Sequence, residues 1–182
     1  NEFFIASGEC NGCHGLDLTP PVLANHTEDG VDVNPVDGWR STMMANSAKD
    51  PFWRAKVSHE VKVNPGHASA LEHKCTSCHA PMGHYDQVLT DGGLYAISDL
   101  EFDPVARDGV SCMACHMQSP DSVGLLFSGA LRFDTNDVEY GPYDAKNLFG
   151  APMASFVGYQ PQYGAHINDA GLCAGCHTLI TE

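Results

Sequence analysis

The chain has 182 residues, of which 43% are apolar, and its 23 acidic against 9 basic side chains give a formal charge of −14. This length fits one domain or two small ones, and the apolar content excludes a disordered chain. The acidic balance excludes nucleic acid and anionic membrane surfaces as partners, and no apolar run approaches the ~20 residues of a membrane span.

Two helices are predicted in the first half of the chain. Segment 41–63 is the most helix-like stretch, because Asn46 or Ser47 can cap a helix there and Pro51 fits its first turn. Apolar residues in this segment recur at every fourth position, which is typical of a buried helix face. A second, shorter helix is predicted over 67–79.

The rest of the chain is predicted to be mostly irregular, because 18 glycines and 11 prolines favour turns and loops. Short strands are predicted at 94–97, 123–127 and 130–133. The last two would form a hairpin around Ser128-Gly129, and segment 134–165 would wrap around the molecule as a loop. The expected fold is a single domain over 1–182 with several short helices and few short strands.

All eight cysteines fall into four identical Cys-x-x-Cys-His motifs. They are Cys10-Asn-Gly-Cys13-His14, Cys75-Thr-Ser-Cys78-His79, Cys112-Met-Ala-Cys115-His116 and Cys173-Ala-Gly-Cys176-His177. This spacing is the attachment signature of c-type haem. Two thiols add to the vinyl groups on one edge of the porphyrin, and the next residue places an imidazole under the iron as the proximal ligand. We therefore expect four covalently bound c-type haems.

Disulfides and zinc are the rival interpretations of these cysteines. An even cysteine count fits disulfides and paired Cys-x-x-Cys knuckles fit zinc, but neither requires a histidine after every pair. Covalent haem is attached outside the cytoplasm, so an extracellular or cell-surface location is expected, with the periplasm as the alternative. The chain begins without a basic segment followed by an apolar one, so we expect a mature product whose export signal has been removed.

Six further histidines are available as second axial ligands: His26, His59, His67, His73, His84 and His166. We predict that the distal ligands are His166, His59, His26 and His84, with His67 and His73 in reserve. His59 lies beside the apolar stripe of the predicted helix, which suits a ligand that faces inward. Methionine is the competing ligand, but two histidines on each iron are favoured and would give low potentials.

Five segments resemble a signature of exported multihaem c-type cytochromes. They are Trp39–Lys56, Cys75–Met82, Asp108–Cys112, Tyr140–Tyr143 and His166–His177. In size and haem count the chain is similar to the tetrahaem extracellular cytochromes that polymerise into filaments, the cytochrome nanowires. The resemblance implies a fold organised around four stacked haems, each with two histidine ligands. It supports His166 as a distal ligand and implies that one distal histidine acts on a neighbouring subunit, for which His26 is our choice.

The expected function is electron transfer without substrate chemistry, because irons with two axial histidines have no open position. The resemblance implies long-range transfer through a homopolymer to external acceptors. A monomeric periplasmic electron shuttle is one alternative. A multihaem nitrite or hydroxylamine enzyme is another, and it would need one iron with a vacant site. Asn25-His26-Thr27 is also a glycosylation sequon, which competes with a ligand role for His26.

Overall fold

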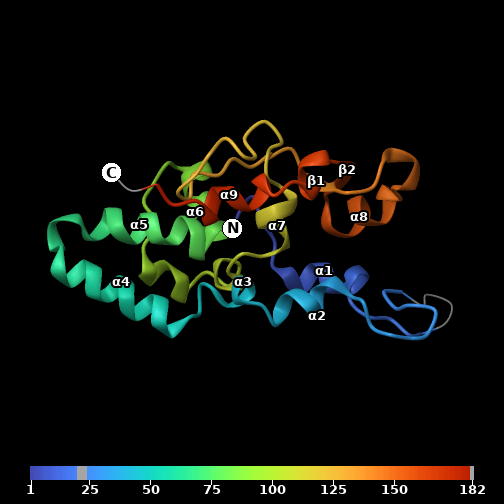
Figure 1. The fold of residues 1–182 in the computed structure, drawn as a ribbon, viewed down its shortest axis with the longest axis horizontal. Helices are drawn as coiled ribbons and strands as arrows, with labels where there is room; N and C mark the ends of the chain where they lie inside the picture. The colour runs from blue at the N-terminus through green and yellow to red at the C-terminus, as the bar shows by residue number, and fades with distance from the viewer. Residues whose placement is uncertain (20–23, 181–182) are drawn as a thin grey trace.

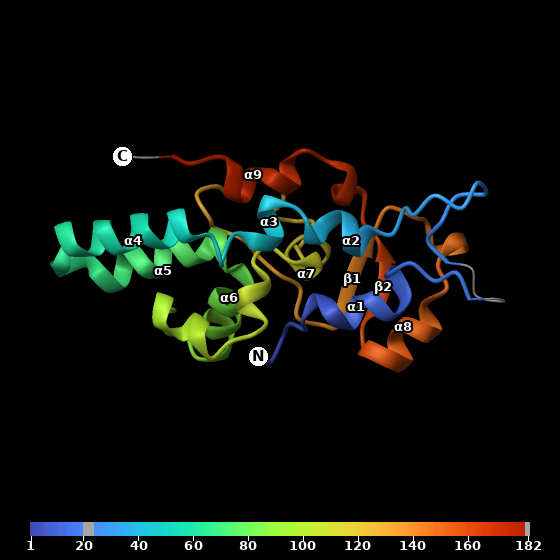
Figure 2. The same cartoon turned by 90° about the horizontal axis from the view of Figure 1, so that it is seen from below.

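The computed structural model describes residues 1–19 and 24–180. The molecule is elongated, with a helical hairpin at one end and an N-terminal loop at the other (Figures 1 and 2). Its helices are α1 (Ser7–His14), α2 (Pro35–Arg40), α3 (Met43–Asn46), α4 (Pro51–Val63), α5 (Ala68–His79), α6 (Pro81–Thr90), α7 (Cys112–His116), α8 (Gly150–Val157) and α9 (Gly171–His177). Within the described ranges, no helix has the length and apolar content to cross a membrane.

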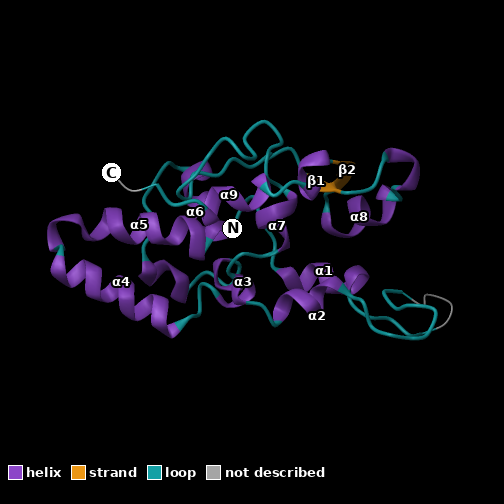
Figure 3. Cartoon of the chain, in the orientation of Figure 1, coloured by secondary structure: helices purple, strands orange, loops and turns teal. Residues whose placement is uncertain are grey.

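Short 3₁₀ turns join several of these helices. They are η1 (Pro65–His67), η2 (Ile97–Glu101), η3 (Ala106–Asp108), η4 (Ala145–Asn147) and η5 (Ala165–Asn168). The structure is 52% helical, which is more helix than expected of a mostly irregular chain. Loops still form much of the surface above α7 and α9 (Figure 3).

The predicted helix over 41–63 is broken in two. Thr42 caps α3, and the Asp50 side chain caps α4 by accepting a hydrogen bond of 2.9 Å from the backbone N–H of Phe52. Pro51 occupies the first turn of α4, as predicted. The break follows from this proline, because the residue before a proline is disfavoured in helical conformation. Asn46 therefore ends α3 and caps neither helix.

The predicted helix over 67–79 is confirmed by α5, which begins one residue later and ends at His79. It packs antiparallel against α4, and together they form the hairpin at one end of the molecule (Figure 1). The buried face of α4 is formed by Trp53 and Val57. These residues belong to the apolar stripe that predicted the helix.

The predicted strands are wrong. Residues 94–96 form no strand, Ile97 begins η2, 120–132 consist of turns and irregular backbone, and within 130–133 Phe133 alone forms a single bridge, to Gln118. The segment predicted to form a hairpin packs along α9 instead. Ser128 N–H donates to Thr178 O at 2.8 Å, and Gly129 N–H donates to Gly175 O at 2.6 Å. Both residues have positive φ, so they turn the chain without forming a strand hairpin.

The described residues form one sheet, and it lies in the segment predicted to be a loop. Strands β1 (Val138–Gly141) and β2 (Gln160–Tyr163) pair in parallel, with Tyr140 opposite Gln162. A parallel pair needs a crossover connection, and α8 lies in that connection and packs on β2.

Two apolar clusters form the core. The first contains Phe4, Met82, Tyr85, Met113, Ala114, Met117, Phe133 and Tyr159. The second contains Ala48, Trp53, Val57, Ala80, Tyr95, Leu100 and Ala106. The N-terminal segment is part of the first cluster: Phe4 is buried, and the backbone N–H groups of Glu2 and Phe3 donate to the Asp86 carboxylate.

Candidate haem-attachment site

All four Cys-x-x-Cys-His motifs occupy the same position in the fold, the last turn of a helix. Helices α1, α5, α7 and α9 each end at the motif histidine. Residues three and four positions apart lie on the same side of a helix. Each helix therefore presents two thiols and one imidazole on one face, which is the donor set that covalent haem attachment requires.

Thiols from different motifs lie next to one another. The Cys10 thiol of the first motif lies close enough to Cys112 of the third for the two thiols to shift each other's pKa, and Cys176 of the fourth has the same relation to Cys78 of the second. Cys115 of the third motif is close enough to Cys173 of the fourth for that thiol to raise its pKa. The four motifs therefore follow one another in space in the order first, third, fourth, second.

Neighbouring thiols and burial raise the pKa of four of the eight thiols, Cys10, Cys75, Cys115 and Cys176. The neighbouring Cys112 thiol, followed by burial, raises the pKa of Cys10. Burial raises the pKa of Cys115 to about 11. The pKa of Cys78 is lowered to about 6, chiefly by the neighbouring Cys176 thiol. Cys78 therefore has more thiolate character at neutral pH than Cys10, Cys75, Cys115 or Cys176.

The imidazole of His116 is oriented for ligation through Nε2. Its Nδ1–H donates a hydrogen bond of 2.6 Å to the backbone oxygen of Tyr140 in β1. Metal-ligating histidines almost always donate the second ring N–H in this way, because it fixes both the tautomer and the ring orientation. The sheet that the sequence did not predict therefore supports the third motif.

The imidazole of His79 lies flat against Trp53 of α4, with ring centroids 4.6 Å apart and planes 7° from parallel. Burial lowers the pKa of His79, which favours the neutral imidazole that a metal requires. The backbone oxygen of His79 accepts a hydrogen bond of 2.8 Å from Ser47 Oγ. The connection between α3 and α4 therefore holds the second motif in place.

Two of the predicted distal ligands are buried near motifs. His166 is 8% exposed, and its Nε2 lies 3.0 Å from Gln118 O, just beyond the third motif. Its Nδ1 is buried and has no hydrogen-bond partner in the described part of the chain. His84 is 5% exposed, and burial lowers its pKa to about 4, so its ring is neutral.

His84 and the reserve ligand His73 stack with ring centroids 4.2 Å apart, and Nδ1 is engaged in both rings, but the two differ in whether Nε2 carries the proton. His84 Nδ1 lies 3.2 Å from Thr76 Oγ1, which leaves Nε2 for a metal. His73 Nδ1 accepts the backbone N–H of Tyr95 at 3.1 Å, so the neutral ring carries its proton on Nε2. The geometry therefore favours His84 over His73.

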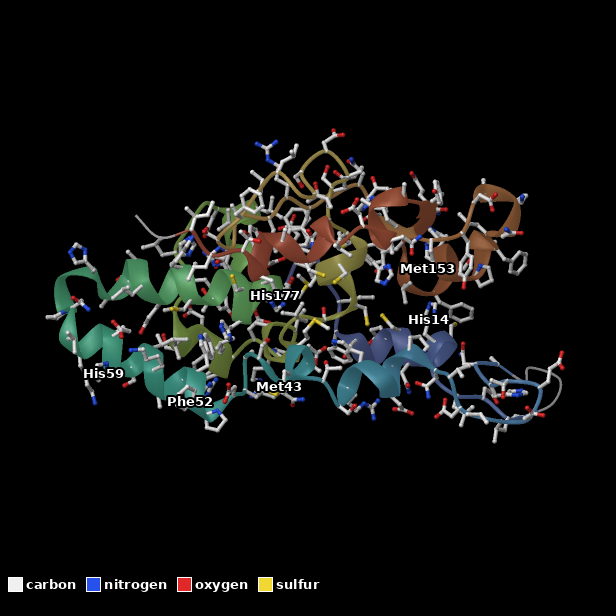
Figure 4. The ribbon with its side chains drawn as sticks, in the orientation of Figure 1. His14, Met43, Phe52, His59, Met153 and His177 are labelled. Atoms are coloured by element: carbon white, nitrogen blue, oxygen red, sulfur yellow. The ribbon has the colours of Figure 1, made fainter. Side chains whose placement is uncertain are left out.

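The expectation that His59 faces inward is wrong. Its side chain is 66% exposed and lies on the outside of α4, along the same edge as Phe52 and Met43 (Figure 4). Two residues along a helix correspond to a rotation of about 200°, so His59 points away from the buried Val57. The reserve ligand His67 is also exposed, at the turn of the α4–α5 hairpin.

His26 lies on the N-terminal loop beside the first motif. The Asn25 side-chain amide donates to Cys13 O at 2.9 Å and Gly15 O at 2.6 Å, so this amide is engaged within the chain and is a poor glycosylation acceptor. His26 Nδ1–H donates to Thr27 O at 2.7 Å, which leaves Nε2 for a metal. That Nε2 is buried and has no hydrogen-bond partner among the residues described.

Across residues 1–19 and 24–180, no three His, Cys, Asp or Glu side chains converge on a point that could hold a bare metal ion. Each motif instead offers a linear set of two thiols and one imidazole along a helix face, which fits a large planar group with a metal at its centre.

No known protein family matches the chain, no curated protein is significantly similar to it in sequence, and no solved structure is significantly similar to it in fold. The functional assignment therefore depends on the motifs and on the contacts that surround them.

Proposed function

We propose that the protein carries four covalently bound c-type haems and transfers electrons along them. The observation that supports this most strongly is the repeated geometry of the four motifs, each with two thiols and one imidazole on the last turn of a helix. Haem iron supplies reversible one-electron chemistry. The chain's own residues would attach the groups and orient the imidazoles.

The order of the motifs supports a path rather than a cluster. Three pairs of neighbouring thiols connect the motifs one after another. The pairs are Cys10 with Cys112, Cys115 with Cys173, and Cys176 with Cys78. Groups attached at neighbouring thiols would lie near one another, which would favour electron transfer between them. The proposed path runs from the first motif through the third and fourth to the second, toward the α4–α5 hairpin (Figure 1).

We further propose that the protein is the subunit of an extracellular homopolymer that delivers electrons to external acceptors. The elongated shape places exposed histidines at the hairpin end and the first motif near the other end (Figures 1 and 4). A head-to-tail contact would therefore continue the path from one subunit to the next. Because His59 and His67 are exposed whereas His26 Nε2 is buried, the hairpin histidines are better placed than His26 to act on a neighbour.

Self-association has to overcome the charge of −14 on each subunit. Exposed apolar side chains supply contact area that would offset this repulsion, among them Phe52 on α4 and Phe149 and Phe156 in and beside α8. A monomeric periplasmic shuttle would use the same four haems without this contact.

Electron paramagnetic resonance of the oxidised protein, combined with a potentiometric titration, tests this proposal. Four one-electron steps with low-spin ferric signals alone are expected if every iron has two axial histidines. A high-spin ferric signal would show an open iron and favour the nitrite or hydroxylamine enzyme instead.

A further inference from the structure

A surface hollow of about 560 Å³ lies between the start of α4 and the segment that contains η2 and η3. It is lined by Lys49, Arg54, Leu100, Glu101, Pro104, Arg107 and Asp108. The whole chain has only 9 basic side chains and a charge of −14, so three of them around one hollow is an unusual concentration of positive charge.

The three basic side chains of this hollow outnumber its two acidic ones, Glu101 and Asp108, and none of the three forms an ion pair within the described residues. In the described residues, the basic side chains that lie within 4.0 Å of a carboxylate oxygen are all elsewhere. Asp108 accepts hydrogen bonds from the backbone N–H and the hydroxyl of Ser7 at 2.7 and 2.9 Å, so its Oδ2 is already engaged. Arg54 Nε–H donates to Ala48 O at 3.1 Å, which fixes the side chain and leaves four guanidinium N–H donors available.

The hollow adjoins the second motif. Leu100 lines it and belongs to the apolar cluster that contains Trp53, and the Trp53 ring lies against His79. Asp108 also lines the hollow, and it accepts hydrogen bonds from Ser7 at the start of α1. Its charge lies close enough to Cys10 and Cys112 to affect their pKa values. The hollow therefore lies between the second motif and the first.

We propose that this hollow binds an oxyanion, a carboxylate or phosphate group held by Arg54, Arg107 and Lys49. Arginine presents paired N–H donors that match the two oxygens of such a group. The oxyanion has two sources. One is a propionate of the haem at the second motif, which depends on the function proposed above, and the other is a small anion from solution.

Two measurements on the haem-loaded protein test this site: calorimetric titration with inorganic phosphate at low salt, and potentiometric titration of the haems. The test variant is Arg54→Gln/Arg107→Gln. The matched control is Arg40→Gln/Arg132→Gln, which removes the same charge and residue type outside the hollow. If the oxyanion comes from solution, the wild type and the control bind phosphate and the test variant binds it at least tenfold more weakly.

If the oxyanion is a haem propionate, phosphate does not bind. One haem of the test variant then has a lower midpoint potential than in the control, because loss of the cations favours the ferric state. The proposal is overturned if the wild type binds no phosphate and the potentials of the two variants are the same. If the purified protein carries no haem, the proposed function is disproved, and the phosphate titration of that same protein still tests binding of an anion from solution.

Discussion

Tyr140 contacts two histidines, of which the sequence predicts His116 as a proximal and His166 as a distal haem ligand. Its backbone oxygen accepts the Nδ1–H of His116, and its ring lies edge-on to His166 with centroids 4.9 Å apart. The position of Tyr140 is set by the pairing of β1 with β2. One residue of a two-stranded sheet therefore orients a predicted proximal ligand and a predicted distal ligand together.

Replacing Tyr140 with alanine should loosen His166 while leaving the backbone bond to His116 in place. We expect the unfolding free energy to fall by about 1–3 kcal/mol and the potential of one haem to change. Tyr140→Phe is the control, because it keeps the ring and loses only the hydroxyl bond to Asp134, at a cost of about 1 kcal/mol. Chemical denaturation and redox titration check both variants, and equal effects of the two would show that the ring contact has no role.

Gly129 should tolerate no side chain. Its φ is +77°, and an added Cβ would lie 2.1 Å from Ser77 Oγ and 2.9 Å from Cys78 Sγ. We expect Gly129→Ala to lower the unfolding free energy by about 1–3 kcal/mol, because it adds backbone strain and overpacks the contact between two motifs. Gly66→Ala, at a position with open space and an ordinary φ, should change it little. Thermal unfolding checks both variants, and equal unfolding temperatures for Gly129→Ala and Gly66→Ala would contradict the close packing at Gly129.

His84 should prove to be an iron ligand and His73 should not. His84 is buried with Nε2 available, whereas His73 Nδ1 accepts a backbone N–H. We expect His84→Met to raise the reduction potential of one haem, because methionine ligation raises haem potentials. His73→Met should leave the potentials of all four haems unchanged. Potentiometric titration of both variants decides, and a rise in His73→Met alone would reverse the assignment.

Assembly should depend on the hairpin end of the molecule. We expect His59→Ala/His67→Ala to abolish filaments in negative-stain images while all four haems stay attached, because both side chains are exposed there. His26→Ala is the comparison: if it alone abolishes filaments, the ligand that acts in trans is the one predicted from the sequence. A wild-type protein that is monomeric in sizing chromatography would rule out the homopolymer.

Local signals in the sequence predicted local features of the structure. The four motifs were visible as residue spacing, and the helix over 67–79 and the role of Pro51 followed from periodicity and capping. The outward direction of His59 could also have been found, because counting from Val57 places it on the opposite face of α4.

Features that depend on distant contacts were missed. The pairing of β1 with β2 joins segments with no alternating pattern, and β2 contains Pro161, which argues against a strand. The apolar run 123–127 resembles a strand in sequence but packs along α9, where Gly129 bonds to Gly175. The order in which the four motifs follow one another in space depends on the same long-range packing, so the spacing of the cysteines in the sequence could not reveal it.

The mass of the denatured, purified protein tests the central claim most directly. Covalent attachment predicts the mass of the chain plus four haem groups, and stepwise loss of one haem when both cysteines of a single motif are replaced by alanine. A colourless protein that lacks this added mass, with disulfides joining Cys10 to Cys112 and Cys78 to Cys176, would contradict it.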